Sequence, residues 1–278
     1  MLVLDRHFKG SLSRNIDDYP DGIVVVVDKP YRWTSADVIR KVKFSAIRHF
    51  GKKNLKVGHS GTLDPLASGV LVVCIGNACK QAQAIQATDK QYLAGICFGA
   101  TTPSYDREKD IDRFYPHDMI NAESVAAALP GFLGSQRQLA PLFSAKQVDG
   151  VRAYELARKL YADGKALDEA ASELLHFSDI VISNLTLEDM RVRGKEADSV
   201  PADGASSRIN VAPVPEGLPE ALIRIDCSKG TYIRSFARDL GERLGTGAFL
   251  SSLVRSRCGA YNVNDALGIG DVVRILSE

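Results

Sequence analysis

The chain has 278 residues, of which 45% are hydrophobic and 25% are charged, an ordinary composition for a globular protein. This length fits one large domain or two small ones. The composition excludes a disordered or collagen-like chain. No uncharged apolar run approaches the length of a membrane span, and the N-terminus lacks the pattern of a signal peptide. The formal net charge is only +1.

The charge is nevertheless segregated along the chain. Residues 29–56 contain nine basic residues and one acid, whereas residues 163–203 contain ten acids and four basic residues. A segregated basic segment predicts a surface that faces a polyanion such as nucleic acid, although a solvated helix face has the same pattern. The five cysteines are scattered and form no C-x-x-C pair. Their pattern favours reduced thiols over a zinc site or a disulfide framework.

The first elements expected along the chain are an arm, a strand and a helix. Residues 1–21 are polar and predict a loose arm, and the apolar run 22–27 predicts a strand buried on both faces. Thr34 and Asp37 resemble a capping box at the start of a helix, which Gly51 ends. The residues of this helix expected to face the core are Ile39, Val42, Ala46 and Phe50.

Further elements alternate without a regular β-α-β rhythm. We therefore predict an α+β fold on a mixed or antiparallel sheet. Residues 188–219 contain four prolines and predict a polar insertion with one hairpin around 208–212. The other expected strands are 70–75, 91–99 and 221–227, and the other expected helices are 79–87, 121–129 with an Asn121 cap, 153–161, and one capped by Thr231 and ended by Gly245.

The turn-rich segment 58–65 is the first place where chemistry could occur, because it contains a histidine, a serine and an aspartate. Thr62 stands where the nucleophile elbow of a serine hydrolase requires glycine, so that class is disfavoured. Asp64 comes just before a buried strand and could act as a nucleophile or general base. Taken alone, however, an aspartate before Pro65 more often forms an Asx turn.

Two further features could bind an anion or a base. Arg234 and Arg238 lie four residues apart on one expected helix face near Lys229, which suits a phosphate or carboxylate but also a solvated helix. Tyr92 lies on an alternating strand, where a tyrosine is either a core residue or a stacking platform.

Four ordered motifs resemble those of the TruB-type bacterial tRNA pseudouridine synthases, which act on uridine-55 in the T-arm of tRNA. They are GIVVVVDKP, GHSGTLDPLASGVLVVCIG, KQYLAGICFG and CSKGTYIRSFARDLGERLG, and the resemblance covers about residues 22–160 and 221–257. It implies the pseudouridine synthase fold, an α+β domain whose mixed, largely antiparallel sheet is flanked by helices around a central catalytic cleft. It also implies no metal and no cofactor.

The resemblance further assigns roles to individual residues. Asp64 matches the catalytic aspartate, Tyr92 is expected to stack on the target base, and Arg234 is expected to pair with Asp64 and keep it ionised. His59 is expected to fill the T-loop space that the flipped base vacates. The other implied substrate-binding residues are Tyr232, Leu253 against the uracil, Lys29 beside the pocket, and Asp106 from a T-D-T-x-D stretch.

The sequence departs from the family pattern at three places. Pro103 replaces the first aspartate of T-D-T-x-D, the lysine of S-A-x-K comes one place early in residues 144–147, and Val254-Arg255 stands where two arginines are usual. The expected domains are an N-terminal arm (1–21), a catalytic domain (22–257) with the insertion 188–219, and a short extension (258–278) without a full C-terminal RNA-binding domain.

The favoured hypothesis is a stand-alone cytoplasmic enzyme, a monomer that binds the T-arm stem-loop of tRNA and needs neither a membrane nor a protein partner. One alternative is a tRNA-folding chaperone with little catalysis, against which Asp64, Tyr92 and Arg234 argue. Another is a guide-dependent synthase subunit, which would carry the C-terminal RNA-binding domain.

Overall fold

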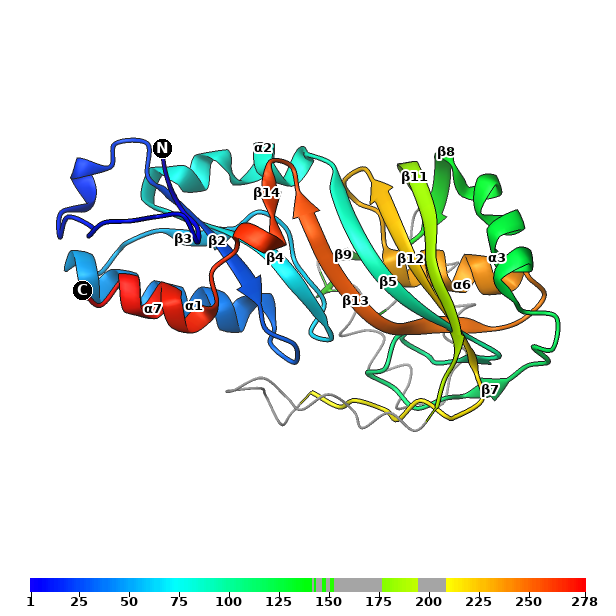
Figure 1. The fold of residues 1–278 in the computed structure, drawn as a ribbon. Helices are drawn as coiled ribbons and strands as arrows, with labels where there is room; N and C mark the ends of the chain where they lie inside the picture. Colours follow the sequence, from blue (N-terminus) through cyan, green and yellow to red (C-terminus); the bar gives the residue numbers. More distant parts are fainter. Residues whose placement is uncertain (142, 144–146, 149–150, 153–176, 195–208) are drawn as a thin grey trace. The chain divides into compact units, whose positions relative to one another are not determined.

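The computed structural model describes residues 1–141, 143, 147–148, 151–152, 177–194 and 209–278. The chain forms two compact units: unit 1 comprises residues 1–92, 200–209 and 253–278, and unit 2 comprises residues 93–199 and 210–252. Two of the boundaries between the units fall inside strands β5 (Lys90–Phe98) and β13 (Ala248–Cys258), which are labelled in Figure 1, so each unit contains a part of both strands.

The strands of unit 1 lie in the order β1–β2–β4–β13, with β3 paired to β4 and β14 paired to β13. The β1–β2 and β4–β13 pairs are parallel, whereas the β2–β4, β3–β4 and β13–β14 pairs are antiparallel. The sheet of this unit is therefore mixed. Its remaining strands are β1 (Leu2–Leu4), β2 (Ile23–Lys29), β3 (Val57–His59), β4 (Ala67–Ile75) and β14 (Tyr261–Asn262).

Helices lie on both sides of β2, which confirms that this strand is buried on both faces. Val24 and Val26 belong to a core cluster against which Ile85 of α2 (Ala82–Ala87) packs. The alternate residues of β2 point the other way, toward α1 (Ser35–Phe50) and α7 (Ile269–Ile275), which lie side by side in Figure 1. The strand runs to Lys29 and ends at Pro30, as a proline predicts.

Helix α1 begins and ends as its sequence predicts. The Asp37 backbone N–H donates to Thr34 Oγ1 (3.0 Å), and the Thr34 N–H donates to the Asp37 carboxylate (2.9 Å), which completes a capping box. Gly51 ends the helix with a left-handed backbone (φ 63°). Ile39 is only half-buried, because Val38 takes the core-facing position one residue earlier.

The N-terminal arm is tied into unit 1 and is not loose. Strand β1 pairs with β2, and the side chains of Leu4, Leu12 and Ile16 are buried. A three-residue strand and scattered single apolar residues have no period that a sequence pattern could reveal. The helix expected over 79–87 is divided into a 3-10 segment, η2 (Gly76–Gln81), and α2. Two further 3-10 segments of unit 1 are η1 (Ile16–Asp18) and η4 (Val263–Asp265).

In unit 2 the strands lie in the order β13–β5–β12–β11–β8. Strand β11 runs antiparallel to both β12 and β8. The bounds are β8 (Gly134–Leu139), β11 (Phe177–Val192) and β12 (Pro219–Cys227), and the short antiparallel pairs are β6 (Ala100–Thr101) with β7 (Arg113–Phe114) and β9 (Gln147–Val148) with β10 (Val151–Arg152).

The polar insertion begins later than the sequence predicts. Strand β11 continues to Val192, which pairs with Pro219 at the start of β12, so residues 188–192 are strand. The acidic residues of this stretch hid the strand because most of its side chains are exposed and show no buried face. Residues 209–212 form no strand, while the rest of the expected hairpin and the expected helix 153–161 lie outside the described residues.

Of the two helix caps predicted in unit 2, one is confirmed and the other is wrong. Asn121 caps α3 (Ala122–Ala128) through the backbone N–H of Ser124 (2.9 Å). Helix α6 (Ile233–Arg243) starts after Tyr232, and Thr231 does not cap it, because the Thr231 hydroxyl donates to the Ser228 carbonyl (3.0 Å). The short η3 segment (Leu129–Phe132) follows α3.

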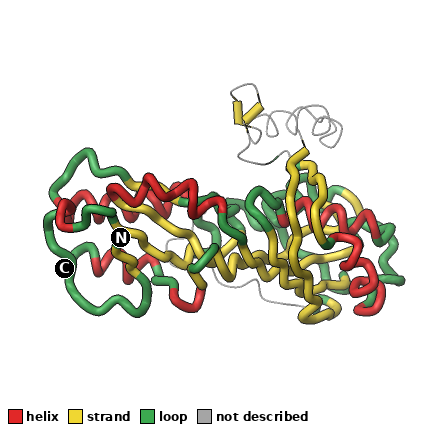
Figure 2. The backbone as a smooth tube through the Cα atoms, turned by 90° about the horizontal axis from the view of Figure 1, so that it is seen from above, coloured by secondary structure: helices red, strands yellow, loops and turns green. Residues whose placement is uncertain are grey.

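Both units combine strands with helices, as Figure 2 shows, and most of the strand pairs described above are antiparallel. The predicted α+β class with a mixed, largely antiparallel sheet is therefore confirmed. Within the part of the chain that the structure describes, no helix is long and apolar enough to cross a membrane.

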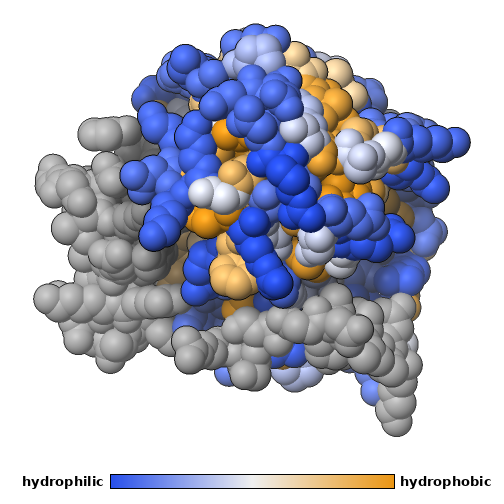
Figure 3. Space-filling model, turned by 90° about the vertical axis from the view of Figure 1, so that its left-hand side faces the viewer, coloured by the Kyte–Doolittle hydropathy of each residue, from blue (hydrophilic) through white to orange (hydrophobic). Residues whose placement is uncertain are grey.

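The outward face of α1 is basic. Arg40, Lys41, Lys43 and Arg48 are exposed, together with Phe44, whose side chain is 68% exposed. Figure 3 looks at the left-hand side of Figure 1, and within the coloured part of that surface hydrophilic residues predominate, with hydrophobic residues between them.

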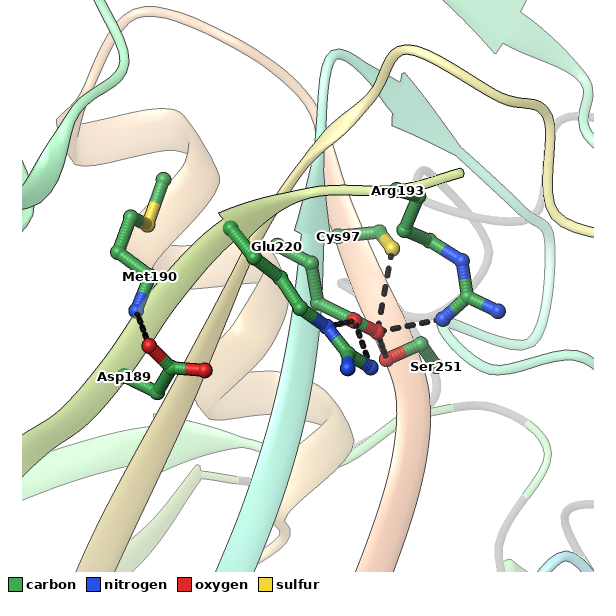
Figure 4. Close-up of polar contacts among 7 residues, drawn as sticks. Cys97, Asp189, Met190, Arg193, Glu220 and Ser251 are labelled. Carbon is green, nitrogen blue, oxygen red and sulfur yellow. Dashed lines mark hydrogen bonds and ion pairs between the residues drawn. The ribbon is translucent and has the colours of Figure 1, made fainter. Parts of the chain in front are cut away.

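A buried carboxylate, Glu220, joins three strands of unit 2. It accepts hydrogen bonds from Arg193 Nη1 (2.6 Å), from Arg191 Nε (2.8 Å) and from the Ser251 hydroxyl (Figure 4). The Cys97 thiol lies 3.7 Å from the same carboxylate, and burial raises its pKa to about 12. This cluster fixes Arg193, the first residue after β11, against the start of β12.

Candidate active site

Asp64 lies in unit 1 on the loop between β3 and β4. The Ser60 N–H donates to the Val72 carbonyl (3.0 Å) as the loop leaves β3, and the Ala67 N–H donates to the Asp64 carbonyl (3.1 Å) where β4 begins. The Asp64 side chain is half-buried. The carboxylate is therefore held on a short loop whose two ends belong to neighbouring strands.

Helix α1 holds the middle of this loop through its first residue. The hydroxyl of Ser35, which is 3% exposed, accepts from the Leu63 N–H (2.9 Å) and donates to the Leu63 carbonyl (3.1 Å). Both backbone groups of the residue before Asp64 are thus bound to one side chain. The capping box beside Ser35 fixes the helix end from which this contact is made.

Lys29 is a fully buried lysine next to Asp64. Its ammonium group donates to the backbone carbonyls of Pro30 (2.9 Å), Trp33 and Pro65 (3.3 Å). Burial lowers the pKa of Lys29 to about 7, and the nearby Asp64 charge opposes that decrease. The lysine is therefore close enough to Asp64 for their charges to interact, and it fixes Pro65, the residue that follows Asp64.

His59 and Arg255 complete the surroundings of the loop. His59 is the last residue of β3 and is half-buried, and its Nδ1 accepts from the Gly61 N–H (3.2 Å). Burial and then the Arg255 charge lower the pKa of His59. The Arg255 side chain is 2% exposed and donates to backbone carbonyls of this loop.

Tyr92 and Leu253 are also in unit 1, on β5 and β13. Tyr92 is 9% exposed and Leu253 is 7% exposed. Leu253 lies opposite Ala67 in the β4–β13 pair, and Ala67 follows Asp64 closely along the chain. Lys90, two residues before Tyr92, donates to the carbonyls of Gln86 and Thr88.

Arg234 and Asp106 lie together in unit 2. Arg234 is 4% exposed, its Nε is 3.8 Å from the Asp106 carboxylate, and its Nη1 donates to the Ser104 carbonyl (3.3 Å). The Ser104 hydroxyl donates to the Asp106 carboxylate (2.6 Å), as does the Glu108 N–H (2.9 Å). Arg234 is therefore a buried, oriented guanidinium, which excludes the solvated-helix interpretation for this residue.

Tyr232 is held by a residue that sequence reasoning missed. Its backbone N–H donates to Gln138 Oε1 (2.8 Å), and its carbonyl accepts from Gln138 Nε2 (3.1 Å). Gln138 lies on β8, which is remote in sequence. Ser104 was missed as well, although the S-x-D spacing of Ser104 and Asp106 is typical of a side-chain-bonded turn. Arg255 was named in the sequence only as part of a departure from the family pattern, without a role.

Unit 1 thus contains Lys29, His59, Asp64, Tyr92 and Leu253, and unit 2 contains Asp106, Tyr232 and Arg234. The structure brings Asp64, Lys29, His59 and Arg255 together in the first unit and Arg234 and Asp106 together in the second. A carboxylate fixed beside buried cations can act as a nucleophile or general base. Among the described residues, no group of three or more His, Cys, Asp or Glu side chains is placed to hold a metal ion.

Comparison with known proteins gives matches over most of the chain. Residues 47–193 match the TruB family pseudouridylate synthase (N terminal domain) model. A protein of Phocaeicola vulgatus called tRNA pseudouridine synthase B is 40% identical over 252 residues, which cover 91% of this chain and 92% of the relative. The protein of the same name from Bacteroides thetaiotaomicron is 42% identical over 250 residues, covering 90% of this chain and 91% of the relative.

Solved structures share the fold at lower identity. A chain of a Cbf5-Nop10-Gar1 complex is 21% identical with a TM-score of 0.59, and the match covers 98% of this chain and 62% of that one. A chain of an H/ACA RNP bound to a substrate RNA containing 2′-deoxyuridine is 20% identical with a TM-score of 0.55, and the match covers 91% of this chain and 53% of that one. This chain therefore spans less than two thirds of either.

Proposed function

The chain belongs to the TruB family of pseudouridylate synthases, and we propose that it converts uridine-55 in the T-arm of tRNA to pseudouridine. The observation that carries this proposal is the family match over residues 47–193, which include Asp64 on its fixed loop. Relatives of nearly the same length called tRNA pseudouridine synthase B support tRNA as the substrate.

The proposed reaction is an isomerisation. The bond between C1′ and N1 of uridine breaks, the uracil turns, and a new bond forms between C1′ and C5. The C5 proton is lost to solvent and N1 gains a proton, so atoms and electrons balance without an oxidant. We assign to Asp64 the role of nucleophile or general base in this sequence.

The neighbouring residues would prepare the carboxylate and the base. Lys29 lies beside Asp64, and its ammonium group would interact favourably with the charged carboxylate during the reaction. Tyr92 is assigned to stack on the uracil, and Leu253 to line the uracil pocket. Following the family resemblance, Arg234 is assigned to pair with Asp64, His59 to the T-loop space left by the flipped base, and Tyr232 and Asp106 to substrate binding.

The partner proposed is the T-arm stem-loop alone, bound by a monomer in the cytoplasm. The basic run at residues 29–56 supports an RNA partner because phosphate contacts supply most sequence-independent affinity. The following experiment distinguishes this enzyme from a protein of the same fold that acts only as a tRNA-folding chaperone.

The test is release of tritium from C5-labelled uridine in an unmodified T-arm stem-loop. We expect wild-type protein to release it and Asp64→Asn to be inactive, while RNA affinity stays within several-fold, because charge is lost only at the reacting group. Asp89→Asn, at an exposed aspartate of the same unit, is the matched control and should keep the wild-type rate. Turnover by Asp64→Asn, with deamidation excluded, contradicts the assignment.

A further inference from the structure

Arg255 is a buried arginine whose hydrogen bonds all reach toward the segment that carries Asp64. Its Nε donates to the Val70 carbonyl of β4 (2.8 Å). Its Nη2 donates to the Gly61 carbonyl (3.2 Å) and its Nη1 to the Thr62 carbonyl (3.4 Å). One guanidinium group thus joins strand β4 to the loop that precedes it.

The two halves of the Asp64 loop are fixed by different parts of unit 1. The second half is bound by Ser35 at Leu63, by Ala67 at the Asp64 carbonyl, and by Arg32 and Lys29 at the Pro65 carbonyl. In the first half, the carbonyls of Gly61 and Thr62 accept from Arg255. Arg255 therefore holds the two residues from which the chain turns into Leu63 and Asp64.

The approach of the strands at Gly69 allows this arrangement. Gly69 is the register partner of Arg255 in the β4–β13 pair, and a Cβ on Gly69 would lie 2.3 Å from the Arg255 carbonyl oxygen. Gly69 also has a backbone that side chains rarely adopt (φ 98°). Only a planar fork with several fixed donors reaches the three carbonyls at once, which a lysine ammonium on a flexible stem does not reproduce.

We propose that Arg255 is a positioning residue, which fixes Gly61 and Thr62 and thereby holds Asp64 in the orientation for its chemical step. This proposal rests on the proposed function, since it assigns Arg255 a role through Asp64. Catalytic groups lose rate steeply when they are displaced by even about 1 Å. Loosening this contact should therefore slow the chemical step and leave binding of RNA to other surfaces intact.

The test is a single-turnover rate at saturating T-arm stem-loop, measured together with the affinity for that RNA. We expect Arg255→Lys to slow the reaction by roughly tenfold to a hundredfold, while affinity and melting temperature stay near wild type. Arg257→Lys is the matched control, because Arg257 lies on the same strand but contacts Gly259, and it should react at the wild-type rate. A wild-type rate for Arg255→Lys, or a loss of affinity as large as the loss of rate, overturns the proposal.

A second measurement uses the unmodified protein and remains decisive if Arg255→Lys fails to fold. In ¹⁵N-arginine-labelled protein, the Arg255 Nη hydrogens should show hindered rotation and slow exchange, since both nitrogens donate to the loop. Rapid rotation like that of a solvated arginine overturns the proposal. The proposed function fails differently, by wild-type protein that is inert or by Asp64→Asn that is active.

Discussion

Buried arginines do much of the positioning in this molecule. Arg234 and Arg255 are 4% and 2% exposed, and each donates to backbone carbonyls of a loop that carries an aspartate, Asp106 or Asp64. The guanidinium group keeps its charge when buried and presents donors in a fixed plane. At both sites the guanidinium group therefore fixes the orientation of the loop in addition to supplying a positive charge.

Arg234→Lys should not behave as a conservative change. The ammonium group cannot bind both the Asp106 carboxylate and the Ser104 carbonyl in the geometry of the guanidinium, nor pair with Asp64 as proposed. We expect the turnover rate at saturating RNA to fall at least about tenfold, equivalent to about 1.4 kcal/mol in the barrier. Arg243→Lys, at the exposed end of α6, is the control. Equal rates for both variants and wild type would contradict the role of Arg234.

Glu220 should make the stability of the protein depend on pH. Burial alone raises the pKa of Glu220, but the bonds from Ser251, Arg191 and Arg193 outweigh it and hold the net pKa below the ordinary value. Because the folded pKa is lower than the unfolded one, this stabilisation is present above the unfolded pKa and is lost as the pH falls through the folded pKa.

Glu220→Gln should therefore lower the free energy of unfolding by roughly 3 kcal/mol near neutral pH, since two arginines lose their carboxylate. The difference from wild type should shrink as urea unfolding is repeated at successively lower pH, because protonation of the folded wild-type carboxyl removes the charge that Glu220→Gln lacks. Glu123→Gln, at an exposed position of α3, is the control. A difference that is constant with pH would show that packing rather than charge is responsible.

The sequence could identify Asp64, Tyr92 and Arg234 as candidates because each lies inside a long motif. It could not reveal the roles of Gln138 and Arg255, because their partners are backbone groups distant in sequence, which carry no residue-type signal. Interactions with the backbone of a segment distant in sequence are set by tertiary structure. For this reason the candidate reacting group was predictable and most of its supports were not.

Helix α1 connects local sequence signals to the Asp64 loop. Its capping box and its terminal glycine are both readable from the sequence, and both are confirmed. The helix starts at Ser35, whose hydroxyl binds both backbone groups of Leu63. Fraying of the first turn of α1 would therefore release the residue next to Asp64.

Removing the cap should weaken this element by a predictable amount. Thr34→Ala deletes the oxygen that accepts from the Asp37 N–H, and we expect a loss of about 1 kcal/mol in the free energy of unfolding. Thr34→Ser keeps that oxygen and should remain close to wild type. The midpoint of urea unfolding measures both variants, and equal midpoints for Thr34→Ala and wild type would show that the cap does not stabilise α1.

Other elements could not be predicted because long-range contacts decide them. The start of α6 is set by Gln138, which binds the Tyr232 backbone and makes a cap at Thr231 unnecessary. The end of β11 is set by pairing with β12, although its residues are acidic and mostly exposed. Strand β1 is similarly too short for its pattern to show.

At the scale of the whole molecule, the segregated charge is the property most relevant to RNA. Lys52, Lys53 and Lys56 at the end of the basic run are all exposed. Lys52 lies 3.3 Å from the Asp17 carboxylate, so part of its charge is already compensated. An exposed pair of this kind is weak and does not prevent contact with phosphate.

Neutralising Lys52, Lys53 and Lys56 together should weaken tRNA binding and flatten its dependence on salt. Each lost phosphate contact lowers the log–log slope by about 0.9 for a duplex, and we expect a total decrease of about 2 because Lys52 is partly compensated. The turnover rate at saturating RNA should change little. Neutralising Lys9, Lys80 and Arg274, exposed residues of the same unit, controls for net charge. An unchanged slope would show that these lysines do not contact phosphate and that the basic run is only a solvated surface.

Unit 1 is assembled from segments that are synthesised early and segments that are synthesised late. Strand β4 and the Asp64 loop are translated early, whereas their partner β13 and the Arg255 guanidinium leave the ribosome nearly 200 residues later. Until then the nascent chain exposes an unpaired strand edge, which invites aggregation or chaperone binding. A chain that terminates before residue 253 would contain the whole Asp64 loop but would lack the part of β13 that pairs with β4. Prematurely released fragments should therefore neither fold this unit nor modify RNA.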